Sequence, residues 1–292
     1  MYVVAGVTGH TGAATAEALL AKKQPVRVIV RSAAKGESWK QKGAEVAVGD
    51  LADPGFLARA VSGAKGVYVL SPPDLSHAQT AKGFLDDRLA FATRVVEGLV
   101  AGKVTNVVLL SSVGAQHAAG TGPIVTAHRF ENLLRGTFPS VTFVRASYFI
   151  DNWAGLVPVA KKDGVLPNFG PTGFKFHQVA STDIGAAVAN ALLHPADGTT
   201  VVELAGREDW SPDDVAATLA SLLGRQVRAI ANPVEGAGPA LAAMGMPAGM
   251  AELYGEMYAS MGKGLMAFEH PQRLTRGSTT LRDALAVHVE AH

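Results

Sequence analysis

The sequence predicts an α/β protein: a doubly wound parallel sheet with helices on both faces, followed by a smaller α/β lobe in the C-terminal part. Two observations carry this prediction. Short β-branched runs alternate with helical patterns through the first half, and after about Ser147 the alternation gives way to loops rich in glycine, proline and aromatic residues. Strands and helices that alternate at this spacing form parallel strands joined by right-handed crossovers.

Six short apolar runs of the first half are typical of strands buried on both faces of a sheet. The predicted strands span residues 3–7, 26–30, 46–48, 67–70, 107–110 and 141–144. The predicted helices between them span residues 11–23, 35–42, 54–61, 80–101 and 125–135. We expect Asp53 to cap the third helix ahead of Pro54, and Gly43, Gly63 and Gly102 to end helices in the left-handed conformation.

The second half predicts a helix over residues 182–193, a strand over 200–204, and a helix that Ser211 caps and Gly224 ends. No repeat and no long linker divides the chain.

The composition excludes several classes of protein. Of the 292 residues, 48% are hydrophobic and 17% are charged, which excludes a disordered chain. The absence of cysteine excludes disulfides, thiolate metal sites and thiol nucleophiles, and the histidines show no metal-ligand spacing. A net charge of +1 gives no electrostatic attraction of the whole protein to nucleic acid or to an anionic membrane. Because no basic segment precedes Val3, we expect no signal peptide and a cytoplasmic protein.

A glycine-rich loop follows the first predicted strand directly and opens the first helix. Such a loop lets the backbone approach a pyrophosphate, and the helix N-terminus offers free N–H groups to the anion, as in Rossmann-type dinucleotide sites. The alternative is a purely structural turn. The expected contacts are Gly6, Thr8, Gly9, His10, Thr11 and Gly12.

Residues after the second and third strands favour NADP(H) over NAD(H). Arg31 stands where an acidic residue would hold the ribose of NAD, and an arginine suits a 2′-phosphate instead. Lys35 adds a second cation one turn later. Asp50, with Leu51 beside it, is placed to contact the adenine. Alternatively, Arg31 is a solvated arginine at the end of a strand, and Asp50 is an ordinary turn aspartate.

Further cofactor contacts are expected at the carboxyl ends of the later strands, where ligands of open α/β sheets bind. The stiff turn at Ser71 and Pro72 is one candidate, and a plain turn is the alternative. Ser111 or Ser112 is placed near the nicotinamide ribose, unless the two serines only cap a turn. Beyond the sixth strand the candidates are Tyr148 and Phe149.

Taken in order along nearly the whole chain, these motifs resemble the NmrA-like family of atypical short-chain dehydrogenases. The resemblance rests on residues 4–12, 28–31, 49–53, 111–112, 128–131, 144–152, 181–185 and 223–225. It implies a Rossmann-type fold and NADP(H), but no single activity. Family members include quinone reductases, triphenylmethane-dye reductases, relatives of isoflavone reductase, and redox sensors without turnover.

The chain departs from ordinary short-chain dehydrogenases, which use a Tyr-x-x-x-Lys pair as the acid. None of the five tyrosines has a lysine four residues later. His128 remains as a candidate proton donor, with Glu131 on the same helical face as a scaffold carboxylate. Two alternatives stand beside catalysis: His128 contacts a ligand, or it satisfies a buried carbonyl.

A stripe of apolar residues from Met250 to Met261 recurs at helical spacing. It is either core or the roof of a pocket for flat apolar ligands, because methionine adapts to such surfaces. The expected pocket residues are Trp153, Phe174, Tyr254 and Met257.

The function expected from this pattern is an NADP(H)-dependent oxidoreductase that passes hydride to an apolar electrophilic acceptor, such as a quinone, a dye or an activated enone. The alternative is a redox sensor that binds NADP(H) without turnover. We expect residues 1–150, joined by 178–205, to form the cofactor domain, and residues 151–177 and 206–292 to form a smaller substrate-binding lobe. No nucleic-acid or membrane partner and no metal are expected, and the protein is expected to be a monomer or a homodimer.

Overall fold

The computed structural model describes residues 1–72 and 74–290. Its centre is an eight-stranded sheet in the order β13-β10-β6-β5-β4-β1-β2-β3, in which every neighbouring pair is parallel. This is the Rossmann-type α/β fold that the alternating pattern predicts. The strands are β1 (Tyr2–Val4), β2 (Val26–Val30), β3 (Glu45–Val48), β4 (Gly66–Val69), β5 (Asn106–Ser112), β6 (Ser140–Ala146), β10 (Gly198–Ala205) and β13 (Thr275–Arg276).

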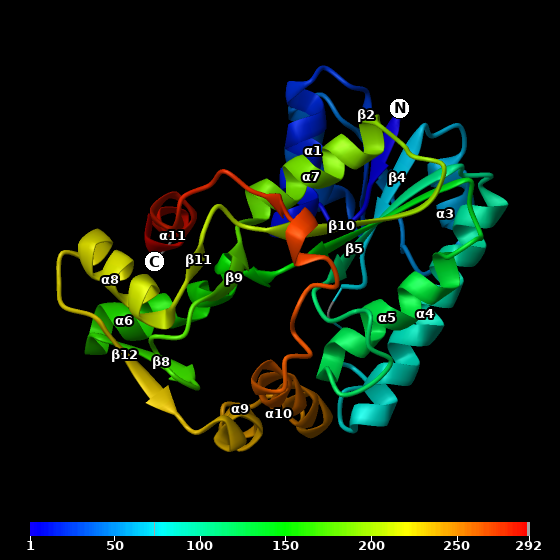
Figure 1. Cartoon of the computed structure of the whole chain (residues 1–292). Helices are drawn as coiled ribbons and strands as arrows, with labels where there is room; N and C mark the ends of the chain where they lie inside the picture. Colours follow the sequence, from blue (N-terminus) through cyan, green and yellow to red (C-terminus); the bar gives the residue numbers. More distant parts are fainter. Residues whose placement is uncertain (73, 291–292) are drawn as a thin grey trace.

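Helices cover both faces of this sheet (Figure 1). On one face α1 (His10–Ala21), α2 (Glu37–Gln41) and α7 (Ser181–Leu193) contribute to a core with Val4, Val28 and Val144. On the other face α3 (Pro54–Val61), α4 (Ala81–Ala101) and α5 (Val125–Leu134) bury a second core around Val107 and Phe143. Both faces are therefore apolar, which explains why the strands read as continuous hydrophobic runs.

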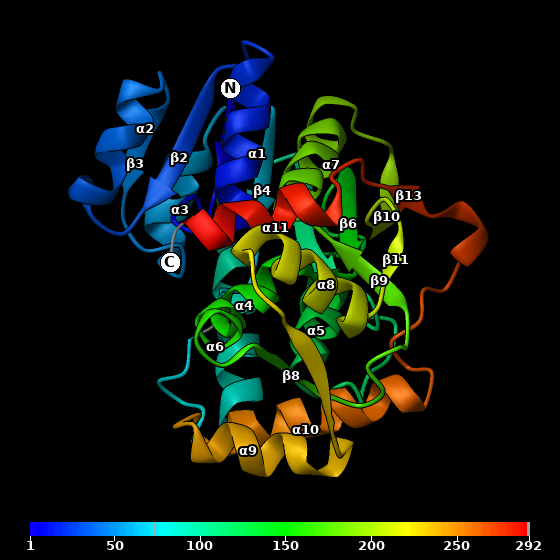
Figure 2. The ribbon, with the colours of Figure 1, turned by 90° about the vertical axis from the view of Figure 1, so that its left-hand side faces the viewer.

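The remaining elements form two small sheets and a group of helices beside the large sheet (Figure 2). Ile150, Trp153, Leu166, Val215 and Leu285 centre a separate apolar core here. The strands are β7 (Tyr148–Phe149), β8 (Val165–Phe169), β9 (Phe176–Val179), β11 (Asp209–Trp210) and β12 (Arg228–Asn232). The helices are α6 (Val157–Asp163), α8 (Pro212–Leu223), α9 (Ala237–Ala243), α10 (Ala248–Gly262) and α11 (Leu281–Glu290).

Chain segments cross between these two parts. Residues 178–205 supply α7 and β10, both of which belong to the large sheet layer. Strand β13 also joins the large sheet, although it lies within the range 206–292 that the sequence assigns to the smaller lobe. The described residues contain no helix with the length and hydropathy needed to span a bilayer.

Backbone conformation explains where the predicted elements end early. The first strand stops at Val4 because Gly6 adopts φ +71°, and the first helix stops at Ala21, ahead of Lys23 at φ +55°. The predicted helix over 35–42 is a 3₁₀ turn, Ala33–Gly36, followed by the short α2. The strands β8 and β9 lie partly or wholly in the segment from Gly164 to His177, which the sequence predicts as loop.

The helix caps follow the sequence with one exception. Asp53 accepts hydrogen bonds from the backbone of the first turn of α3, and Ser211 forms a capping box with Asp214. Gly43 and Gly63 have positive φ as expected, but the prediction for Gly102 is wrong. Gly102 has φ −76°, and a Cβ atom there would lie 2.4 Å from Cγ2 of Val61, so close packing of α4 against the end of α3 requires this glycine.

Candidate active site

The glycine loop folds tightly between β1 and α1. The backbone N–H of Gly9 donates to the carbonyl of Gly6 at 3.0 Å, and Gly6 has φ +71°. A Cβ atom on Gly12 would lie 2.3 Å from the same carbonyl oxygen, so no larger residue fits there. Helix α1 has no side-chain cap, and its first N–H groups stay available to an anion.

The side chains of the loop point in different directions. Thr8 and His10 are exposed, whereas Thr11 is buried and its hydroxyl accepts a hydrogen bond from Tyr68 at 3.1 Å. The Thr11 side chain is therefore core, and only its backbone faces the loop. His10 Nδ1 lies 3.7 Å from Asp151 Oδ1, which links the loop to the segment after β7.

The residues expected around the adenosine end lie where β2 and β3 finish. Arg31 and Lys35 are exposed, and among the described residues neither meets a carboxylate within ion-pair distance. Asp50 accepts a hydrogen bond from the backbone of Ala52 at 2.9 Å, and Leu51 packs partly against the core. The Pro72 carbonyl accepts from Arg88 at 2.9 Å.

A cleft of about 830 Å³ opens beside the glycine loop, at the carboxyl ends of β4, β5 and β6. Leu70 joins the two features: it lines the cleft, and its Cδ2 lies 2.6 Å from the position of a Cβ on Gly6. Helix α10 and the segment 266–271 form another wall. The cleft gathers eight of the predicted site residues: Ser71, Ser111, Ser112, Tyr148, Phe149, Phe174, Tyr254 and Met257.

Helix α10 faces two ways. Met250 and Leu253 are buried against Ala78 and Phe84 near the start of α4. The next turns present Tyr254, Met257, Tyr258 and Met261 to the cleft. The first half of the helix is therefore core, and its second half forms a wall of the cleft.

A side chamber of about 300 Å³ adjoins the cleft and shares several of its walls. Phe169 and Tyr258 meet edge to face at 5.2 Å between ring centroids, and Tyr148 and Phe176 do so at 5.5 Å. Trp153 lines this chamber but not the cleft, and its indole N–H donates to Gln178 at 2.8 Å. Burial raises the pKa values of Tyr148, Tyr254 and Tyr258, so these phenols keep their protons.

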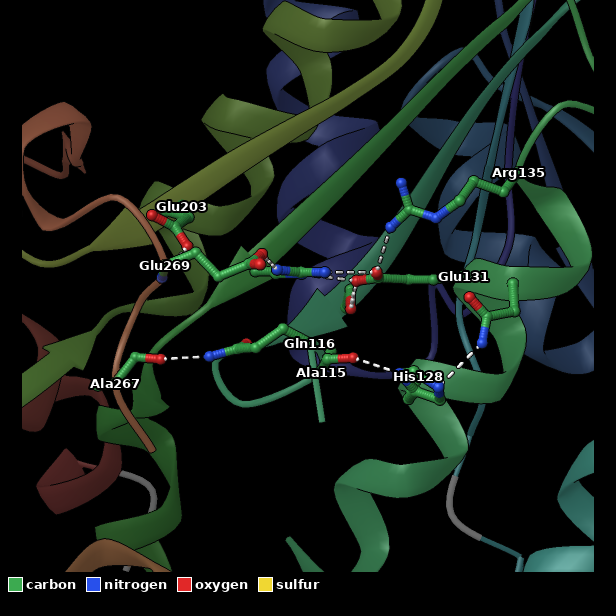
Figure 3. A network of polar contacts seen from close by, with 11 residues as sticks. Ala115, Gln116, His128, Glu131, Arg135, Glu203, Ala267 and Glu269 are labelled. Carbon is green, nitrogen blue, oxygen red and sulfur yellow. Dashed lines mark hydrogen bonds and ion pairs between the residues drawn. The ribbon is translucent and has the colours of Figure 1, made fainter. Parts of the chain in front are cut away.

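A buried ionic network supports the cleft from behind (Figure 3). Glu131 on α5 accepts from Arg145 at 2.8 and 2.7 Å and from the Ser111 hydroxyl at 2.5 Å. Burial opposes the charge of Arg145, but Glu131 and Glu269 outweigh it and raise the pKa of the guanidinium. The Ser111 hydroxyl is therefore engaged with Glu131, away from the cleft.

Comparison with known proteins places this chain in a family. The NmrA-like family model matches residues 2–269. The chain belongs to the NmrA-like family. An NAD(P)H azoreductase of Xenophilus azovorans is 27% identical over 263 residues, which cover 89% of this chain and 86% of that protein. Quinone oxidoreductase 2 of Escherichia coli is 24% identical over 296 residues, and the match covers 98% of this chain and 98% of that protein.

Solved structures agree with this NmrA-like fold. An NADPH complex of the Escherichia coli NADPH-dependent quinone oxidoreductase superposes with a TM-score of 0.81 at 23% identity, covering 98% of this chain and 99% of that one. The triphenylmethane reductase of Citrobacter sp. superposes with a TM-score of 0.80 at 22% identity, covering 99% of both chains. At these identities the structures establish the shared fold.

In this NmrA-like protein, His128 does not line the cleft. Its Nδ1 lies 2.8 Å from the carbonyl oxygen of Ala115, and its Nε2 lies 2.9 Å from the Asn132 amide (Figure 3). The carbonyl can only accept, so Nδ1 carries the proton and Nε2 accepts from Asn132. This geometry favours the alternative in which His128 satisfies a buried carbonyl.

The sequence analysis did not predict several residues of the cleft, and two of these, an imidazole and a carboxylate, form a pair. His177 on β9 and Asp209 on β11 pair across an antiparallel ladder, and both line the cleft. The residues stand 32 positions apart, and nothing in their spacing links them. Within the described residues, no three acidic or histidine side chains form a metal-binding group.

Proposed function

We propose that this protein is an NADPH-dependent reductase of aromatic, electrophilic acceptors such as quinones, azo compounds and dye cations. The observation that carries the proposal is the contact between Gly6 and Leu70. It joins the N-terminus of α1, which has no side-chain cap and begins in a glycine-rich loop, to an aromatic cleft at one edge of the sheet. The names of the relatives, azoreductase and quinone oxidoreductase, support the same chemistry.

The loop residues fit a dinucleotide. Glycine at position 12 leaves room for a diphosphate against α1, and the first-turn N–H groups supply donors for it. Arg31 and Lys35, exposed beyond β2, would hold a 2′-phosphate, which favours NADPH over NADH. Bound NADPH would supply the hydride.

The cleft residues would bind and orient the acceptor. Phe149 and Tyr148 follow β6 at the sheet edge, and Met257 and Tyr258 close the opposite wall. A flat aromatic molecule between these walls would lose its water shell and lie against the cofactor, which lowers the entropic cost of reaction. The side chamber would accept a second ring, so we propose acceptors with two or more rings as preferred substrates.

The direct experiment is to follow NADPH and NADH oxidation with naphthoquinone, an azo dye and a triphenylmethane dye cation. We expect turnover with each class and a preference for NADPH. Tight NADPH binding without turnover of any acceptor would instead support a redox sensor, and the absence of NADPH binding would refute both functions.

A further inference from the structure

An imidazole and a carboxylate form a pair in the wall of the cleft. His177 Nδ1 lies 2.7 Å from Asp209 Oδ1, and the Arg276 guanidinium lies 2.7 Å from the same oxygen. Because a carboxylate accepts the Nδ1 proton, the other ring nitrogen of His177 is left for a ligand. His177 is 29% exposed and its ring lies 5.4 Å from that of Phe268, so it forms part of an aromatic wall.

The phenols of the cleft and the Ser111 hydroxyl are poor proton donors. Its phenols are made weaker acids by burial, which raises the pKa values of Tyr148, Tyr254 and Tyr258. The Ser111 hydroxyl donates to Glu131. Imidazole is the side chain that ordinarily gains and loses its proton near neutral pH.

We propose that His177 is the proton donor for acceptors whose reduction requires a proton, with Asp209 positioning its ring. This inference rests on the proposed reductase function. A quinone that receives a hydride from NADPH becomes a hydroquinone monoanion. The imidazolium form of His177 gives its Nε2 proton to that anion, which yields the neutral hydroquinone and leaves a neutral imidazole whose Nδ1–H stays on Asp209. An azo group likewise takes one hydride and one proton to become a hydrazine. A proton from solvent then restores the imidazolium, so each turnover consumes one hydride and one solvent proton.

The charged groups around His177 suit this role. Asp209 on β11 holds Nδ1–H and thereby directs Nε2 away from the ladder. Although burial opposes ionisation, hydrogen bonds from Arg276 and His177 lower the pKa of Asp209, so the carboxylate stays charged. Lys175, which also lines the cleft, lies 3.5 Å from Asp214 on α8.

The chemistry of the acceptors provides an internal control. A triphenylmethane dye cation becomes neutral when it takes a hydride and needs no proton. His177→Asn keeps a donor for Asp209 but cannot pass on a proton. We expect it to lower kcat for quinone and azo reduction by about 100-fold or more, and to leave dye-cation reduction within about twofold.

Three further measurements sharpen the test. The pH dependence of quinone reduction should flatten in His177→Asn, and Asp209→Asn should lower quinone reduction more than dye reduction. His194→Asn, an exposed histidine at the end of α7, should change neither rate. The Kd for NADPH, measured by fluorescence, should be the same for all of these variants.

A probe without turnover separates this inference from the proposed function. A nitrophenol mimics the hydroquinone monoanion, and its absorbance distinguishes phenol from phenolate. Protonated His177 should favour bound phenolate in the unaltered protein, and His177→Asn should remove that shift. If the unaltered protein reduces no acceptor, the proposed function fails, while the nitrophenol titration still tests the acid site.

Two results would overturn the assignment. One is an equal loss, or no loss, for quinone and dye cation in His177→Asn. The other is an unchanged nitrophenol spectrum in that variant. If His177→Asn does not fold, the inference is tested by Asp209→Asn and by the pH profile of the unaltered protein. Identical pH profiles for quinone and dye-cation reduction would refute proton donation by His177.

Discussion

At the scale of single residues, the proposed preference for NADPH rests on Arg31. It follows β2 directly, is exposed, and pairs with no acidic side chain among the described residues. In Arg31→Ala we expect NADPH binding to weaken by about 1.5–3 kcal/mol, the scale of a charge-assisted hydrogen bond, while NADH binding barely changes. Fluorescence titration with both cofactors measures this. Arg228→Ala, an exposed arginine on β12, is the matched control. Equal losses for the two cofactors would mean that Arg31 only supports the loop.

Two histidines, His128 and His177, show which site residues the sequence alone does not identify. His128 lies one helical turn from Glu131 in a segment that resembles the family, yet both of its ring nitrogens have partners within the protein. His177 lies in an unremarkable segment, yet it faces the cleft. The difference arises from neighbours such as Asp209, which only the pairing of β9 with β11 brings close. No local pattern encodes that pairing.

At the scale of elements, α10 is buried against the start of α4 in its first half and lines the cleft in its second half. Met257→Ala should change the ratio of kcat/KM between quinone and dye acceptors, because Met257 faces the cleft, and should leave the Kd for NADPH intact. Leu253→Ala is the matched variant one turn earlier. It is buried against α4, so we expect a loss of about 2–5 kcal/mol of stability with unchanged acceptor ratios. Urea unfolding and acceptor kinetics on both variants test the division. If Met257→Ala only lowers stability, the whole stripe is core.

Most elements of the large sheet were predictable because each carries its own pattern, whereas β13, two exposed polar residues long, carries none. A strand such as Val26–Val30 is apolar at every position except Arg27, and a helix such as Pro54–Val61 has a cap and a proline at its start. The small strands β8 and β9 are different. They span segments such as Val165–Phe169, which contains a proline and is only partly buried, so alternation and turn residues did not distinguish it from a loop.

At the scale of the whole molecule, one ionic network ties the C-terminal segment to the large sheet. Arg145 on β6 is 2% exposed and holds Glu131 of α5 together with Glu269, which lies 124 residues further along the chain. Glu203 of β10 accepts from the backbone N–H groups of Glu269 and His270 at 2.6 and 2.8 Å. The segment 266–271, which forms a wall of the cleft, is thereby fixed to three elements of the sheet layer.

This arrangement predicts an unequal response to the loss of its two carboxylates. Glu131→Ala should cost about 3–5 kcal/mol, because it removes the bidentate partner of a buried guanidinium and leaves that charge poorly compensated. Glu269 is 42% exposed, and its loss lets water reach Arg145, so Glu269→Ala should cost much less stability. It should instead raise KM for acceptors, since the wall of the cleft loses one attachment. Urea unfolding with acceptor kinetics measures both effects. Equal losses of stability in the two variants would show that Arg145 depends on both carboxylates alike, and an unchanged KM in Glu269→Ala would show that Glu203 alone holds the wall in place.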